Sequence, residues 1–206
     1  MPKRNEAERL FELTELERSF WAQSIYPAGM DEVGRGPLAG PVVAGFVILP
    51  AEPLIEHVND SKKLTEKRRE LLYPQIVELA LAHGTGWVEP YLIDELNILN
   101  ATKLAFKAAF ENAGGCAHVL VDAVKGLDIP AKQTALIHGD ALSYLIAAAS
   151  ILAKVERDRY MIEQHEIYPM YGFDKNKGYG TAQHIAALRE YGPCPLHRRS
   201  FIGGLL

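Results

Sequence analysis

Short apolar runs rich in β-branched residues alternate with longer helical patterns along most of this chain. The predicted strands cover residues 30–33, 42–49, 84–88, 118–122 and 134–137. Apolar residues at helical spacing predict helices at 5–21, 65–83, 91–112, 141–164 and 181–191. Because strands come first and then alternate with helices, we expect an α/β fold in which helices flank a mixed sheet.

A single domain is the expected organisation. The chain has 206 residues, of which 48% are apolar and 23% charged, so it can bury a sizeable core without disulfides or a structural metal. No internal repeat, low-complexity segment or long linker divides it. We therefore expect one domain over residues 1–206, in which residues 1–25 form a helical N-terminal extension.

Net charge and cysteine usage say little about the function of the chain. The chain carries 22 basic and 26 acidic residues, a net charge of −4 that neither indicates nor excludes a nucleic-acid partner. Cys116 and Cys194 lie far apart and lack CxxC spacing, which favours a reduced, cytoplasmic setting. The first residues are charged, and the longest uncharged apolar run, 141–153, is too short to span a bilayer. We therefore expect neither a signal peptide nor a membrane contact.

Carboxylates occur where three of the predicted strands end. Asp31 and Glu32 close the first strand, just before a pair of glycines. Asp122 closes the strand at 118–122, and Asp140 follows the strand at 134–137. Because ligands tend to bind at the strand ends of open α/β sheets, these four acids are candidate catalytic and metal-binding residues.

Four clustered carboxylates would repel one another strongly in a site of low dielectric constant, and a divalent cation relieves that repulsion. Mg²⁺ prefers carboxylate and water oxygens. Two such ions about 4 Å apart can activate a water and stabilise the leaving oxygen in phosphoryl chemistry. Structural roles remain open at this point, because Asp140 could cap its helix and Asp122 could be a turn residue.

A glycine loop directly follows the first acidic pair. Gly34 and Gly36 can bring the backbone close to a ligand and turn N–H groups towards a phosphate or sugar. Arg35, between them, can pair with phosphate. The loop is neither a P-loop nor a GxGxxG motif, so a nucleoside triphosphate or dinucleotide site is not expected. As a bare GxG, the loop is also compatible with a structural turn.

Two groups of residues concentrate positive charge locally, and the second group also contains aromatic side chains. Basic residues mixed with aromatic ones suit a nucleic-acid backbone and its sugars. For residues 67–69 a solvated helix face is the alternative interpretation. The groups are Lys62, Lys63, Lys67, Arg68 and Arg69, and Lys175, Lys177, Arg198 and Arg199 with Tyr171, Phe173 and Tyr179.

Six motifs in this order resemble those of ribonuclease HII, the type 2 ribonuclease H family. The resemblance covers about residues 28–201, and motifs of this length in series are very specific. They are GMDEVGRGPLAGPVVAG at 29–45, NDSKKL at 59–64, VLVDAVKG at 119–126, HGDALSYLIAAASILAKVERDRYM at 138–161, YGFDKNKGYGT at 171–181 and GPCPLHRRSF at 192–201.

The resemblance implies a ribonuclease H-like fold, with a helical C-terminal part at roughly 165–206 that helps to grip the substrate duplex. It implies hydrolysis of the RNA strand of RNA–DNA hybrids and cleavage 5′ of single ribonucleotides embedded in duplex DNA. The products would carry a 3′-hydroxyl and a 5′-phosphate, and the cofactor would be Mg²⁺ or Mn²⁺, with two ions in the active complex. The protein would act as a monomer.

Particular residues also inherit expected roles from the resemblance. The four acids of the family fall on Asp31, Glu32, Asp122 and Asp140, the same four that the strand ends indicate. The loop that senses the 2′-hydroxyl falls on Gly34, Arg35 and Gly36, and the tyrosine that packs on the neighbouring deoxyribose falls on Tyr179. Together with Arg35, Lys62 and Lys63 are expected to bind phosphates without reading sequence.

Two positions depart from the family pattern. Ala123 stands where members commonly have glycine, and Leu142 stands where they often have lysine.

Two alternative functions also remain. The chain could bind nucleic acid without cleaving it, or it could cleave another phosphodiester substrate such as a DNA junction. The intact acids oppose the first alternative, and the GRG loop opposes the second.

Overall fold

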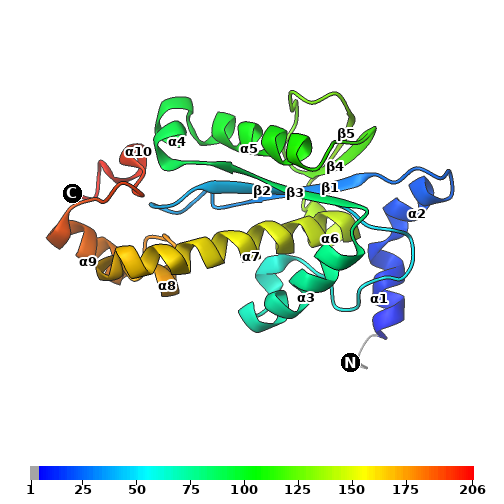
Figure 1. Ribbon diagram of the computed structural model, residues 1–206, viewed down its shortest axis with the longest axis horizontal. Helices are drawn as coiled ribbons and strands as arrows, with labels where there is room; N and C mark the ends of the chain where they lie inside the picture. The colour runs from blue at the N-terminus through cyan, green and yellow to red at the C-terminus, as the bar shows by residue number, and fades with distance from the viewer. Residues whose placement is uncertain (1–4) are drawn as a thin grey trace.

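A five-stranded mixed sheet lies at the centre of the structure, a computed structural model that describes residues 5–206 (Figure 1). Its strands are β1 (Ala28–Val33), β2 (Val42–Ile48), β3 (Ala82–Val88), β4 (His118–Asp122) and β5 (Lys132–Leu136). Their order is β3-β2-β1-β4-β5. The pairs β1–β2 and β2–β3 are antiparallel, whereas β1–β4 and β4–β5 are parallel. The predicted mixed sheet is thus confirmed.

Helices cover both faces of this sheet, as expected. The α-helices are α1 (Glu6–Leu13), α2 (Glu15–Trp21), α3 (Glu66–Leu79), α4 (Pro90–Leu96), α5 (Ile98–Asn112), α6 (Gly139–Leu142), α7 (Tyr144–Ile167), α8 (Phe173–Asn176), α9 (Ala182–Tyr191) and α10 (Arg199–Ile202). Two 3₁₀ turns, η1 (Ser61–Lys63) and η2 (Pro169–Tyr171), complete the structure. In Figure 1, α4 and α5 lie on one side of the sheet, and α3 and α7 lie on the other.

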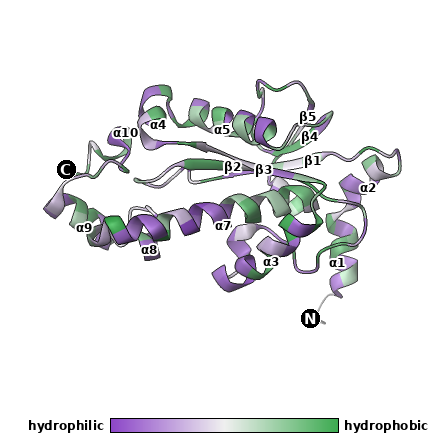
Figure 2. Ribbon diagram, viewed as in Figure 1, coloured by the Kyte–Doolittle hydropathy of each residue, from purple (hydrophilic) through white to green (hydrophobic). Residues whose placement is uncertain are grey.

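Alternation along β2 shows how the two faces form separate cores. Val47 packs into the cluster shared with α1, α3 and α7, while Phe46 packs into the cluster shared with α5. Successive side chains of a strand point to opposite faces, so one fully apolar strand can serve both cores. Figure 2 shows that α7 is mainly hydrophobic at the end near α6 and mainly hydrophilic towards α8.

Three predicted helices each contain a break that periodicity does not reveal. The breaks lie at Thr14, Asn97 and Ser143. Asn97 has a φ of 66°, and its side chain accepts hydrogen bonds from the backbone of Leu99 and Asn100, so it ends α4 and caps α5. Ser143 accepts from the backbone N–H of Ile146 and caps α7. Asp140 therefore does not cap the alanine-rich helix, because it lies in the separate turn α6.

The C-terminal part packs around one end of α7 and reaches back to the glycine loop. Its small core contains Met161, Tyr171, Phe173 and Leu196. An isolated β-bridge joins Ala39, just after the loop, to His197. Within residues 5–206, no helix is long and apolar enough to cross a membrane.

Candidate active site

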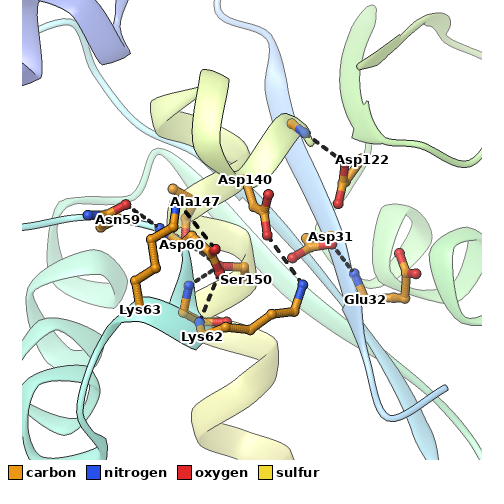
Figure 3. Close-up of polar contacts among 12 residues, drawn as sticks. Asp31, Glu32, Asn59, Asp60, Lys62, Lys63, Asp122, Asp140, Ala147 and Ser150 are labelled. Carbon is orange, nitrogen blue, oxygen red and sulfur yellow. Dashed lines mark hydrogen bonds and ion pairs between the residues drawn. The ribbon is translucent and has the colours of Figure 1, made fainter. Parts of the chain in front are cut away.

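Three carboxylates meet at the C-terminal edge of the parallel strands. Asp31 lies in β1 and Asp122 ends the neighbouring β4, while Asp140 comes from α6 (Figure 3). One carboxylate oxygen from each residue lies within 4.8 Å of the others. The backbone N–H of Gly139 donates to Asp122 Oδ1 at 2.7 Å and fixes the start of α6 beside β4. Residues separated by more than 100 positions thus share one site.

Two acids of the cluster, Asp31 and Asp122, have raised pKa values. Burial, together with the charges of Glu32, Asp122 and Asp140, raises the pKa of Asp31 well above its usual value. Burial also raises the pKa of Asp122, and the charge of Asp140 adds to this effect. Because ionised carboxylates this close repel one another, a cation would favour their joint ionisation.

Lys62 supplies one such positive charge. Its Nζ lies 3.3 Å from Asp140 Oδ2, and the side chain points into the acidic cluster (Figure 3). Burial lowers the pKa of Lys62, but Asp140 and Asp31 outweigh that effect, so the pKa is raised. Lys63, the next residue, turns away, and its Nζ lies 3.8 Å from Asp60 Oδ2. Of these two lysines, the structure brings Lys62 to the acids.

The donor atoms of this cluster suit a hard divalent cation. Asp31, Asp122 and Asp140 offer only carboxylate oxygens, which are preferred by Mg²⁺ and also suit Mn²⁺. Glu32 lies outside this group of three. Its Oε1 pairs with Arg35 Nη1 at 3.1 Å, and its Oε2 is buried without a hydrogen-bond partner. Burial raises the pKa of Glu32, although Arg35 opposes that shift. The unpartnered oxygen can also serve a cation.

The glycine loop borders a cleft of about 270 Å³ beside the acids. Gly34 has a φ of 90°, and a Cβ there would lie 2.3 Å from Arg157 Nε, so only glycine fits. On the outer side, a Cβ on Gly36 would lie 3.8 Å from Tyr179 Cε1. The Tyr179 ring thus stands next to the loop. The lining residues are Asp31, Glu32, Val33, Gly34, Arg35, Gly36, Ser61, Lys62, Lys154 and Tyr179.

A buried histidine pair holds the backbone of Tyr179. His184 Nδ1 lies 2.9 Å from the Tyr179 carbonyl oxygen, and the two Nε2 atoms of His184 and His197 lie 3.0 Å apart. The carbonyl can only accept, so His184 Nδ1 carries a proton and His197 Nε2–H donates to His184. Burial and the neighbouring His184 lower the pKa of His197 to about 4, and burial also lowers that of His184. Both rings are neutral at pH 7, as this pattern requires.

Sequence reasoning missed the roles of three basic residues at the site. Lys154 lines the cleft and donates to Asp158 Oδ1 at 2.8 Å. Burial lowers the pKa of Lys154, although Asp158 opposes that shift. The available signal was a lone lysine directly after an apolar helical run. Arg157 is fully buried beneath the loop, as is Arg198, which the sequence pattern places in a basic, aromatic segment suited to nucleic acid. Nothing in the spacing of either arginine distinguishes it from a surface arginine.

The two departures from the family pattern lie beside the acids. Ala123 follows Asp122 with a φ of 48°, in the left-handed region where glycine is favoured. Its Cβ therefore adds local strain that glycine would avoid. Leu142 lies in α6, two residues after Asp140, and 57% of its surface is exposed.

The chain matches the ribonuclease HII family over residues 28–203. It belongs to the ribonuclease HII family. Ribonuclease HII of Caldanaerobacter subterraneus subsp. tengcongensis is 52% identical over 203 residues, which cover 98% of this chain and 84% of that relative. Ribonuclease HII of Desulfitobacterium hafniense is 54% identical over 198 residues, 95% of this chain and 76% of the relative.

Solved structures show the same fold. The ribonuclease H2 of Pyrococcus horikoshii matches with a TM-score of 0.72 and 28% identity, covering 85% of this chain and 93% of that one. Bst-RNase HIII in complex with Mn²⁺ matches with a TM-score of 0.68 and 16% identity over 98% and 71% of the two chains. As a member of this family, the protein is a metal-dependent endoribonuclease that acts on the RNA of RNA–DNA hybrids.

Proposed function

We propose that this protein also cuts duplex DNA on the 5′ side of a single embedded ribonucleotide, leaving a 3′-hydroxyl and a 5′-phosphate. The observation that carries the proposal is the position of the glycine loop. The loop and Tyr179 border the same cleft as Asp31, so a sugar and the phosphodiester beside it would fit together there. RNA differs from DNA by the 2′-hydroxyl, and backbone N–H groups can read that hydroxyl.

Metal binding is assigned to Asp31, Glu32, Asp122 and Asp140 in this proposal. Two ions, Mg²⁺ or Mn²⁺, would supply an activated water and charge stabilisation for the departing 3′-oxygen. The oxygen-only cluster of three aspartates supports this assignment, and so does the unpartnered Glu32 oxygen. Manganese is bound by the Bst-RNase HIII of similar fold.

The remaining residues bind and orient the substrate. Gly34, Arg35 and Gly36 face the ribose, and Tyr179 packs on the deoxyribose next to it. Lys62 and Lys63 bind phosphates without reading sequence. Lys62 is well placed for this, because its ammonium group lies at the acids and would become available to a phosphate if cations neutralised them.

The C-terminal part, roughly 165–206, is proposed to grip the duplex. Residues 1–25 are proposed to form a helical extension of the same single domain, and residues 1–4 of this range lie outside the part of the chain that the structure describes. The bridge between Ala39 and His197 supports the first role, because it ties this part to the glycine loop. We also propose that the enzyme works as a monomer, since one chain supplies every acid of the site. The proposed compartment is the cytoplasm.

A duplex DNA with one ribonucleotide tests the proposal directly. The protein is incubated with it in Mg²⁺ or Mn²⁺, and an otherwise identical all-DNA duplex serves as control. Cleavage immediately 5′ of the ribonucleotide, abolished by EDTA and absent from the control, is the expected result. Binding without cleavage would favour a non-catalytic protein. Cleavage of the all-DNA duplex would favour an enzyme with another phosphodiester substrate.

Tyr179→Ala is expected to lower kcat/KM about tenfold at a lone ribonucleotide in DNA, the scale of one lost aromatic stacking contact. The loss should be smaller within an all-RNA strand, because the neighbouring sugar there carries a 2′-hydroxyl and packs less closely on the ring. Tyr191→Ala is the matched control, since Tyr191 is also exposed but ends α9 outside the cleft. Equal losses on both substrates would argue against packing on deoxyribose.

A further inference from the structure

Two arginines lie fully buried under the glycine loop without an acidic partner. Arg157 and Arg198 each have 0% exposed surface, and neither forms an ion pair with any described residue. Burial lowers the pKa of Arg157 to about 10 and that of Arg198 to about 9. Burying an unpaired charge costs free energy, so other polar groups must stabilise each guanidinium.

Backbone carbonyls provide that compensation, and the two arginines bind different ones. Arg198 Nη2 donates to the Gly34 oxygen at 2.6 Å, and its Nη1 donates to the Arg35 oxygen at 3.1 Å. The Nε and Nη2 of Arg198 also donate to the Gly40 oxygen, at 3.0 and 2.7 Å. Arg198 thus binds both peptides that join the residues of the glycine loop.

Arg157 donates instead to the segments that flank the loop. Its acceptors are the carbonyl oxygens of Ala39, Pro41 and Lys177, at 3.2, 2.9 and 3.0 Å. The side chain also packs under Gly34, but it makes no hydrogen bond to the loop peptides. The two buried arginines therefore differ in one respect: Arg198 bonds to the peptides of the glycine loop, and Arg157 does not. Variants of the two residues can test this difference.

The contacts of Arg198 also fix the direction in which the N–H groups of the loop peptides point. In a trans peptide, the C=O and the following N–H point in opposite directions. Because the carbonyls of Gly34 and Arg35 point inward to Arg198, the N–H groups of Arg35 and Gly36 point away from it. No described residue accepts a hydrogen bond from either N–H. Both peptides border the cleft that contains Asp31 and Tyr179.

We propose that Arg198 is a positioning residue for ribose selectivity: by holding the carbonyls of Gly34 and Arg35 inside, it presents the N–H groups of Arg35 and Gly36 to the 2′-hydroxyl. This inference rests on the proposed function, because it assumes that the loop reads the sugar. The planar guanidinium of Arg198 bonds three carbonyls at once from donors in a fixed, forked arrangement. A lysine retains the charge but lacks the fork.

The test compares binding of two duplexes that differ by a single ribonucleotide. Dissociation constants are measured by fluorescence anisotropy in EDTA, which prevents cleavage. In Arg198→Lys, the preference for the ribonucleotide-containing duplex is expected to fall about five- to tenfold, the scale of one lost hydrogen bond. The affinity for all-DNA duplex should change by less than about twofold, because phosphate contacts are retained. Both dissociation constants are measured on the same sample, so their ratio does not depend on the fraction of the protein that is folded.

Arg157→Lys is the matched control, because it also replaces a fully buried arginine that binds only carbonyls. It should lower Tm comparably but keep most of the binding preference. Arg198→Met removes the buried charge together with the hydrogen bonds to the loop carbonyls, and it is the second variant measured if Arg198→Lys is too unstable. All measurements are made below the lowest Tm of the set.

Retention of the preference in both Arg198 variants would overturn the inference. So would an equal loss in Arg157→Lys, because general loosening of the loop would then explain the effect. Failure of the proposed function appears separately, in the wild-type protein. A wild-type protein without any ribonucleotide preference would refute sugar reading by this loop, whatever the variants do.

Discussion

Asp31→Asn is expected to lower cleavage at least about a thousandfold, because metal ions contribute several kcal/mol of charge stabilisation and each 1.36 kcal/mol is a factor of ten in rate. Asp31 is the most buried acid of the cluster, and one of its carboxylate oxygens lies within 4.8 Å of oxygens of Asp122 and Asp140. Binding of the hybrid should be largely intact, since the loop and the basic residues are unchanged. Initial rates on a hybrid in Mg²⁺ and in Mn²⁺ measure the effect.

The same variant is expected to be more stable than the wild type when no metal is bound. Burial and three neighbouring acids raise the pKa of Asp31, so the folded state binds more protons than the unfolded state above the usual carboxyl range. This contribution to stability is present at low pH and is lost as pH rises through the folded-state pKa. Asparagine carries no charge, so Tm in EDTA should exceed that of the wild type at pH 8 and approach it at pH 5.

Asp128→Asn provides the control for this experiment. Asp128 is an exposed acid that pairs with Lys107 away from the cluster, so its loss should leave cleavage unchanged. Added Mg²⁺ should raise the Tm of the wild type and of Asp128→Asn more than that of Asp31→Asn. An active Asp31→Asn enzyme would contradict the metal assignment. A lower Tm for Asp31→Asn at pH 8 would contradict the proposed charge repulsion.

Gly29→Ala is expected to destabilise the protein by about 3 kcal/mol, the upper range for overpacking of a core. A Cβ on Gly29 would lie 2.0 Å from the carbonyl carbon of Leu145 and 2.4 Å from the Ile146 nitrogen. Both atoms belong to the backbone of the first turn of α7, so the helix itself has to move. For a chain of this size, the expected fall in Tm is about 6–12 °C.

Calorimetry of Gly29→Ala and Gly204→Ala checks this expectation. A Cβ on Gly204 would meet no heavy atom within 4 Å, so its alanine variant should keep the wild-type Tm within about 1 °C. Cleavage should also decline in Gly29→Ala, because the displaced turn of α7 directly follows α6 and Asp140. An unchanged Tm for Gly29→Ala would mean that β1 and α7 are not packed this closely.

Local patterns in the sequence were sufficient to predict most of the strands and helices. Runs such as 118–122 predict buried strands because β-branched apolar residues pack well in a sheet. The helix ends were harder, as at Asn97 and Ser143, where one polar side chain bonds to the next turn and splits a continuous periodic pattern. Periodicity averages over many residues, so it does not register a break at one position.

The sequence by itself determined the mixed α/β class, the family and the candidate acids, because these depend on residue types and on order along the chain. Only the tertiary structure decided that Asp31, Asp122 and Asp140 converge while Glu32 pairs with Arg35. It also decided that Arg198 lies inside, under the loop. Parallel pairing of β1 with β4 and packing of the C-terminal part against residues 34–41 create these contacts. Such contacts join residues about 90 to 160 positions apart, a separation over which local propensity carries no information.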